Sequence, residues 1–401
     1  LEERLKKVPF VDRDFYFRQK TPYLKKNNID RASIAKMHSK FPDTFIGQIV
    51  GEVESNFFQK RNNPMRFREQ LVQQASVVPT YDRSIEEAEA SLRAWWKRYI
   101  DFFGELVAMS GGMTAAQYFY EWGVPLAMAG SLNEAPWSNN RTIFSFTRSG
   151  ARQYGKPWAA YQTSYALGAS ASSRLTEEEA LKLVTPDRPW SDGLDFGLAP
   201  SAFKRCQYIA YYSGTSFQLF ETDPTGLAVE NKENKQWALT QNGEAVKDMY
   251  QWSRTEAGKR GSFYAPILFL ADYYHGNWEW KHASEWKIWY MYPYQDADYM
   301  FHHVTRAFDP FPGHDYGKDH SLMKDKGWSL VNSKLGDIYD LYFANPPSGV
   351  VTLEELLKYP LAMLLGNVRF SEELLANMQN YVEKGGTLVL NAAPHQSFLS
   401  D

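Results

Sequence analysis

Two stretches of the sequence place a glutamate directly after an apolar run, where a β-strand would end. "VPLAMAGSLNEAPW" carries Asn133 and Glu134 after the apolar residues 124–129, and "TSFQLFETD" ends a strand-like run at Glu221. Two carboxylates across a cleft are what glycosidic cleavage requires, because one protonates the leaving oxygen while the other attacks the sugar or activates water. An asparagine beside the acid can donate to a sugar hydroxyl in the transition state. The pair Glu134 and Glu221 therefore predicts carbohydrate chemistry.

The simpler interpretation of each glutamate is a solvated surface charge. Asn133 and Trp137 beside Glu134 favour a site, whereas "ETDP" after Glu221 also fits an ordinary acidic turn. Further carboxylates follow strand-like runs at Glu52, Glu54 and Asp272. We include Glu52 as a residue that lines the cleft, although an ion pair with a neighbouring helix is the favoured interpretation.

Aromatic residues make up 16% of the chain, with 13 Trp and 25 Tyr, and many stand in polar, loop-like surroundings. Such rings suit half-wet clefts and stack on sugars, but a large aromatic core explains the composition equally well. "YYHGNWEWKH" after an apolar run has the composition of a sugar-contacting loop. The aromatic and histidine side chains that we expect to contact a sugar are Trp137, Tyr165, His275 and Trp278.

Metal and cofactor sites have little support in the sequence. His275 and His282 are seven residues apart, which is no metal-ligand spacing. A later segment holds His302, His303, His314 and His320 among Asp315 and Asp319; we interpret it as a solvated loop, with a divalent metal as the alternative. Arg148 and Arg152 stand four apart on one predicted helix, which favours anchoring to acidic neighbours over binding an acidic sugar. We predict no cofactor and no metal.

Composition excludes several classes of partner. The net charge of −3 gives no electrostatic case for binding nucleic acid or an anionic membrane. The single cysteine, Cys206, can form neither an internal disulfide nor a cysteine-based zinc site. No apolar run approaches the roughly 20 residues of a transmembrane helix, and the charged N-terminus shows no signal peptide. The chain begins at Leu1, as a processed form or a fragment would, and a secreted or periplasmic location is slightly favoured.

Strand and helix patterns alternate along the chain. The apolar runs of four to eight residues fit parallel strands that are covered on both faces. No nucleotide-binding glycine motif follows the first strand. We expect helices at residues 84–109, 113–123, 141–155, 201–214 and about 240–258, and barrel strands at residues 45–51, 124–130, 157–165, 215–221 and 264–272. This is an α/β pattern that favours a (β/α)8 barrel, with five of its eight strands recognisable.

The tail, starting near residue 325, changes character. "GDIYDLYFANP" predicts a strand, "TLEELLKYPLAMLLGN" a short helix and a buried strand, and "TLVLNAAP" a further strand. Between them, "SEELLANMQNYVEKGG" predicts a helix with Ser371 as its N-cap and a glycine pair at its end. We therefore divide the chain into a barrel at 1–324 and a small flavodoxin-like α/β domain at 325–401, which is short enough that the natural chain would continue.

On these motifs the sequence resembles a known group of enzymes. "LNEAP" after a strand resembles the Asn-Glu motif of retaining glycoside hydrolases with (β/α)8 barrels, and "FQLFETD" resembles the strand that ends in their second glutamate. The tail resembles the glutamine-amidotransferase-like domain that follows the barrel in β-galactosidases of the trimeric type. No cysteine follows "LLGN", where an amidotransferase would need its nucleophile.

The resemblance implies roles for these residues. Glu134 would be the acid/base, Glu221 the nucleophile, and Asn133 the donor to the 2-hydroxyl. The tail would be catalytically inert and would help to build a homo-oligomer. Two alternatives stay open: a non-catalytic carbohydrate-binding protein on a decayed barrel, and a polysaccharide lyase that uses Tyr and His as base and acid.

Overall fold

The structure of the chain is a computed structural model. It describes residues 10–12, 31–51, 84–103, 106–109, 115–129, 140–163, 200–221, 227–230, 233–256, 259–276, 296–298, 300–301, 304 and 338–390.

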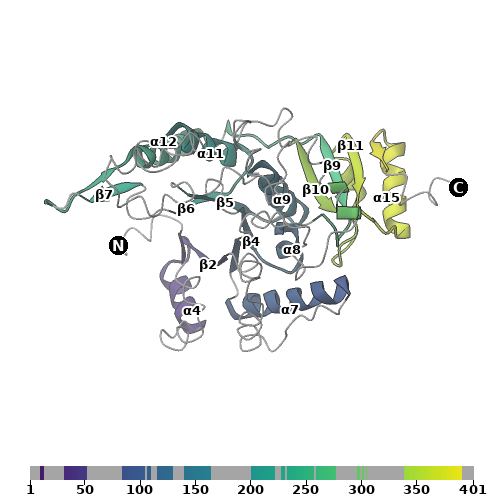
Figure 1. The fold of residues 1–401 in the computed structure, drawn as a ribbon, viewed down its shortest axis with the longest axis horizontal. Helices are drawn as coiled ribbons and strands as arrows, with labels where there is room; N and C mark the ends of the chain where they lie inside the picture. Colours follow the sequence, from purple (N-terminus) through teal and green to yellow (C-terminus); the bar gives the residue numbers. More distant parts are fainter. Residues whose placement is uncertain are drawn as a thin grey trace.

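The larger sheet is parallel and its strands follow one another in chain order (Figure 1). It has six strands: β1 (Phe10–Asp12), β2 (Phe45–Gly51), β3 (Leu106–Met109), β4 (Leu126–Ala129), β5 (Trp158–Thr163) and β6 (Phe217–Glu221). Parallel strands in consecutive order are the arrangement that repeated β–α units produce. Within the described residues the sheet is open, because β6 and β1 are not paired. The protein is thus a mixed α/β protein with parallel sheets.

Helices separate these strands along the chain, as the sequence predicts. They are α4 (Arg31–Lys40), α7 (Ile85–Phe103), α8 (Ala116–Glu121), α9 (Asn140–Gln153), α11 (Pro200–Tyr212) and α12 (Gln241–Glu256). At the start of α7, Ser84 Oγ accepts from the Glu87 amide at 3.3 Å and Glu87 Oε2 accepts from the Ser84 amide at 3.1 Å, a reciprocal cap. None of the described helices combines the length and the apolar character needed to cross a membrane.

A second parallel sheet lies at the other end of the molecule (Figure 1). Its strands are β9 (Ile267–Ala271), β10 (Tyr339–Phe343), β11 (Leu361–Leu365) and β12 (Thr387–Val389), in the order β10-β9-β11-β12. Numbered from β9 this order is 2-1-3-4, which is how flavodoxin-like sheets begin. Along the chain, α14 (Leu353–Leu356) connects β10 to β11, and α15 (Glu372–Glu383) connects β11 to β12. The two helices pack against each other. Ser371 caps α15 and Gly385 follows it with φ 93°, as the sequence predicts. A short antiparallel pair, β7 (Ala228–Glu230) and β8 (Trp237–Leu239), stands apart from both sheets.

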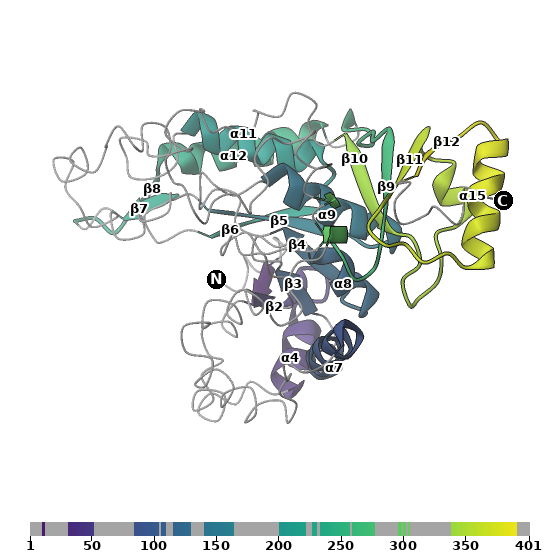
Figure 2. The ribbon, with the colours of Figure 1, turned by 45° about the vertical axis from the view of Figure 1, so that its right-hand side comes forward.

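Helix α9 lies between the two sheets, packed against β4 and β10 (Figure 2). Residues 143–151 of this helix are all buried. Its side chains bond to the backbone of β10, the edge strand of the second sheet. Gln153 Nε2 donates to the Phe343 carbonyl at 2.9 Å and Gln153 Oε1 accepts from the Phe343 amide at 3.0 Å, while Ser149 Oγ accepts from the Leu341 amide at 2.8 Å. The helix thereby replaces a neighbouring strand along the edge of β10.

Two expectations about the elements are corrected. The predicted helix at 84–109 ends at Phe103, and its last residues form β3. The apolar run Leu106–Met109 follows a glycine in sequence, and glycine favours the end of a helix. Likewise β1 lies in the charged N-terminal segment, before the first strand that we expected at residues 45–51.

The strand at 264–272, which we expected in the barrel, belongs to the second sheet. β9 pairs in parallel with β10 and with β11. The physical reason is that an apolar run buried on both faces identifies a central parallel strand but does not identify the sheet that it joins. The second sheet therefore draws on strands from both sides of residue 325.

Candidate active site at the carboxyl edge of the larger sheet

The carboxyl ends of β2 to β6 lie along one edge of the larger sheet, because all of its strands run parallel. The register pairs Gly51 with Met109 at the ends of β2 and β3, and Thr163 with Glu221 at the ends of β5 and β6. Polar residues that follow several strands are brought to one edge in this way. Such an edge is where α/β proteins with this strand order carry their working groups.

The predicted catalytic residues follow strands that flank a single common neighbour. Glu221 is the last residue of β6, and β6 pairs with β5. β5 pairs on its other side with β4, whose last residue is Ala129. Adjacent strands are about 4.8 Å apart, so β4 and β6 are about 10 Å apart across the sheet. The register sets Ala129 level with Gln218, three residues before Glu221. Asn133, Glu134 and Trp137, which follow β4, lie outside the described residues.

Three further predicted contact residues also lie outside the described residues. Glu52 comes directly after the last residue of β2, Tyr165 comes two residues after the end of β5, and Trp278 lies further along, after β9. His302, His303, His314 and His320 likewise lie outside the described residues.

The two faces of the sheet differ in what covers them. On one face, the cluster formed by Leu126, Met128, Ala159 and Tyr161 is buried, with Phe217 and Leu219 of β6 packed against it. On the other face, Ala127, Ala129, Trp158 and Ala160 pack in the core that includes residues of α8 and α9.

A chain of glutamine side chains fixes β5, β6 and α11 to one another. Gln162 Nε2 donates to Gln218 Oε1 at 2.6 Å, and Gln218 Nε2 donates to the Gln207 carbonyl at 2.9 Å. Gln162 and Gln207 are fully buried. Polar bonds in a dry setting favour a single geometry, so β6 and its terminal Glu221 are held in a defined register.

His275 is described and lies at the other sheet. It follows β9, and its Nδ1 is 2.6 Å from Oδ2 of the buried Asp272. Asp272 also accepts from the amides of Tyr274 at 2.8 Å and Asn367 at 3.0 Å. Asp272 therefore ties the end of β9 to the segment after β11. The described contacts of Asp272 and His275 stabilise the turn that follows β9. We expected β9 in the larger sheet, but it belongs to the second one.

A buried carboxylate elsewhere connects α7 to the core. Glu89 is 2% exposed and accepts from Trp122 Nε1 and from the Tyr273 hydroxyl, each at 2.8 Å. Burial, together with Glu89, raises the pKa of Tyr273, so its hydroxyl remains a donor. No group of three metal-ligating side chains occurs in the described part of the chain.

Arg148 and Arg152 have the structural role that their spacing predicts. Arg148 Nε donates to Oδ1 of Asp340 at 2.9 Å, and Arg152 pairs with the other carboxylate oxygen. Asp340 lies on β10, so these ion pairs join α9 to the second sheet. The sequence indicated an acidic partner but gave no means of finding one that is 192 residues from Arg148.

No protein-family model matches the chain, and no curated protein matches it. Among solved structures, the chain is similar to α-L-fucosidase isoenzyme 2 from Paenibacillus thiaminolyticus, with a TM-score of 0.41 and 10% sequence identity. The alignment covers 93% of this chain and 45% of that enzyme, so the chain spans less than half of the enzyme's length.

Proposed function

We propose that the chain is a retaining glycoside hydrolase in which Glu134 is the acid/base and Glu221 the nucleophile. The observation that supports this most is the strand order at the carboxyl edge. Glu221 ends β6, and the segment with Asn133 and Glu134 follows β4, on the other side of β5.

The spacing of the strands suits a retaining mechanism. β4 and β6 lie about 10 Å apart across the sheet, a lateral spacing that two converging glutamate side chains can reduce to the roughly 5–5.5 Å between the carboxyl groups of retaining enzymes. The proposal requires residues 130–134 to carry Glu134 along the three-residue offset between Ala129 and Glu221.

The chemistry follows in two steps. Glu221 attacks the anomeric carbon while Glu134 gives its proton to the leaving oxygen, so the glycosidic bond breaks and a glycosyl ester forms on Glu221. Glu134 then takes a proton from water, whose oxygen attacks the anomeric carbon and releases Glu221. We assign Asn133 to the 2-hydroxyl, and Trp137, Glu52 and Tyr165 to substrate binding. His275 and Trp278 follow β9 of the second sheet, so we leave them out of this site.

The second sheet has a supporting part in this proposal. Its 2-1-3-4 strand order is compatible with a catalytically inert amidotransferase-like domain that contributes to a homo-oligomer. The division at residues 1–324 and 325–401 belongs to the same proposal, with β9 as a strand contributed from before the boundary.

The test uses a screen of activated aryl glycosides on the wild type, Glu221→Gln and Glu134→Ala. We expect Glu221→Gln to abolish turnover. Azide should restore turnover of Glu134→Ala and give a glycosyl azide of retained configuration, because azide needs no general base. Glu244→Gln, a change at an exposed residue on α12, is the matched control and should leave the rate unchanged. Unchanged activity in either active-site variant would contradict the assignment.

A further inference from the structure

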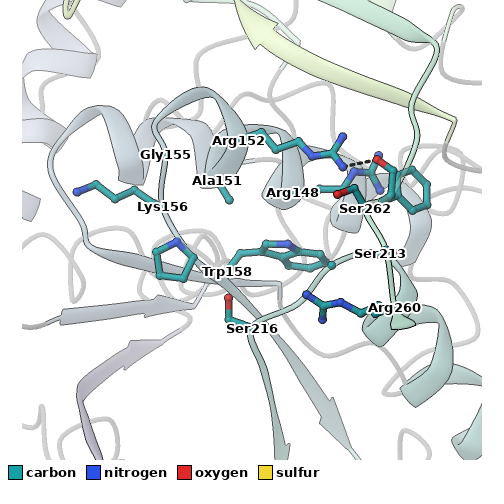
Figure 3. A pocket seen from close by; sticks show the side chains of 14 residues that line it. Arg148, Ala151, Arg152, Gly155, Lys156, Trp158, Ser213, Ser216, Arg260 and Ser262 are labelled. Carbon is teal, nitrogen blue, oxygen red and sulfur yellow. Dashed lines mark hydrogen bonds between the residues drawn. The ribbon is translucent and has the colours of Figure 1, made fainter. Parts of the chain in front are cut away.

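A pocket opens at the amino ends of the strands, away from the proposed active site (Figure 3). It has a volume of about 270 Å³, close to the lower end of the roughly 300–1,000 Å³ of small-ligand sites. Its walls come from the start of β5, from the residues before β5, β6 and β9, and from the end of α9. β5 alone places about 17 Å between this edge and the carboxyl edge of the larger sheet.

The lining is strongly cationic. Arg148, Arg152, Lys156 and Arg260 line the pocket, and no carboxylate does. Arg148 and Arg152 contact Asp340, which is fully buried behind them. Its negative charge offsets one of the four positive charges. The carboxyl ends of α9 and α11 add only about half a negative charge each. The net charge around the pocket is therefore positive, which favours binding of an anion.

Arg260 retains donors that can reach a ligand. Its Nη1 donates to the carbonyls of Thr215 at 2.8 Å and Tyr211 at 3.5 Å. A guanidinium carries five N–H groups, and those on Nε and Nη2 of Arg260 bond to none of the described residues. Figure 3 shows the Arg260 guanidinium beside the ring of Trp158, near the Ser216 hydroxyl. Bidentate donors of this kind match the oxygens of phosphate and carboxylate groups.

The other lining residues leave room for such a group. Added Cβ atoms at Gly155 and Gly261 would meet nothing within 4 Å. The hydroxyls of Ser213, Ser216 and Ser262 supply neutral donors around the same space. The ring of Trp158 offers an apolar wall that suits the body of a monosaccharide.

We propose that this pocket binds a compact oxyanion, a phosphate or carboxylate group, either free or carried on a monosaccharide. The proposal does not depend on the glycosidase activity, because the site lies at the opposite edge of the sheet and its test measures binding.

Isothermal titration with inorganic phosphate, glucose 6-phosphate and neutral glucose tests it on the whole chain. We expect saturable binding of the two anions that weakens with added salt. Ser262→Glu adds a carboxylate at an exposed wall residue and should weaken phosphate about tenfold or more, as should Arg260→Met, by loss of charge-assisted bonds. Ser39→Glu, an equal change of charge on α4, is the control and should bind as the wild type.

The arms of the experiment separate the sources of the anion. Equal affinities for phosphate and glucose 6-phosphate identify a free anion, and tighter binding of the sugar phosphate identifies a sugar-borne group. Ser262→Glu keeps Arg260 and does not lie in a helix, so it still tests the pocket if Arg260→Met disturbs α11. The absence of saturable anion binding, or affinities in both variants equal to that of Ser39→Glu, would overturn the proposal.

Discussion

At the scale of residues, Asp340 is a buried carboxylate that joins two arginines of α9 to β10. It is fully buried between Arg148 and Arg152, and the Tyr359 hydroxyl donates to it at 2.9 Å. Burial raises the pKa of Tyr359, which keeps that hydroxyl protonated. The carboxylate therefore pairs with two guanidinium groups and offsets one of their two positive charges.

We predict that Asp340→Asn lowers the free energy of unfolding by about 3–5 kcal/mol, because it leaves a buried arginine without its counter-charge. Urea unfolding followed by tryptophan fluorescence measures the change. Asp248→Asn removes the exposed pair with Lys204, at 3.5 Å, and should alter stability by about 1 kcal/mol or less. Equal effects of the two substitutions would contradict the role of Asp340.

The same carboxylate predicts a pH dependence. Burial alone would raise its pKa, but Arg148 and Arg152 hold the pKa of Asp340 below its ordinary value of 3.8. A folded-state pKa below the unfolded one gives stability that is present above the unfolded pKa and is lost as pH falls through the folded one. The stability gap between wild type and Asp340→Asn should thus be widest near neutral pH and should narrow below about pH 4. Urea midpoints across this range test it; a gap that widens in acid would refute it.

At the residue scale, the sequence predicted local contacts but not long-range partners. The spacing of Arg148 and Arg152 on one helix predicted an acidic partner, and the cap at Ser371 was correctly predicted from local pattern. The identity of Asp340 was out of reach, because the contact is made by tertiary packing across 192 residues. The pocket around Arg260 was missed for the same reason, since its walls come from separate segments.

At the scale of elements, α9 replaces a missing strand beside β10. Alternate residues of β10 direct backbone groups to the open edge, and Ser149 and Gln153 pair with them. Arg148 Nη2 donates to the Tyr339 carbonyl at 2.6 Å in the same row. An edge covered in this way is protected from pairing with another chain.

Gln153→Leu should therefore destabilise the fold. The substitution keeps the bulk of the side chain but leaves the amide and the carbonyl of Phe343 without partners. We expect a loss of about 1–3 kcal/mol in urea unfolding. The matched change Gln251→Leu, at an exposed position of α12, should have almost no effect. Identical midpoints for both variants would show that the edge of β10 does not need α9.

Element prediction succeeded where periodicity was strong and failed where an element was short. The predicted helices that became α8, α9, α11, α12 and α15 were confirmed. We predicted the residues of β3 as the end of the preceding helix, because a run of four apolar residues matches both the helical and the strand periodicity. β1, of three residues, gives no periodicity at all.

At the scale of the whole molecule, the two sheets share one core. A single cluster of buried residues includes Ala127 of β4, Phe144 of α9 and Leu341 of β10. We predict that both sheets lose structure together in urea. Hydrogen exchange of peptides from β4 and β10 should show equal opening free energies, and opening of β9–β12 at lower urea than β4–β6 would contradict the prediction.

The assignment of strands to sheets was the main failure at this scale. Length, charge and apolar runs indicated a parallel α/β protein with a second small sheet, but β9 was placed in the wrong one. Nothing local distinguishes a central strand of one parallel sheet from a strand of another. The order 2-1-3-4 emerges only when long-range pairing is known.

The most direct test of the central claim is to trap the glycosyl-enzyme. An activated 2-fluoro glycoside of a sugar that the chain turns over slows the second step, and mass spectrometry then locates the label. The account predicts a single ester on the peptide that contains Glu221, formed rapidly in the wild type and absent from Glu221→Gln. A label on another carboxylate, or turnover with no covalent label, would contradict it.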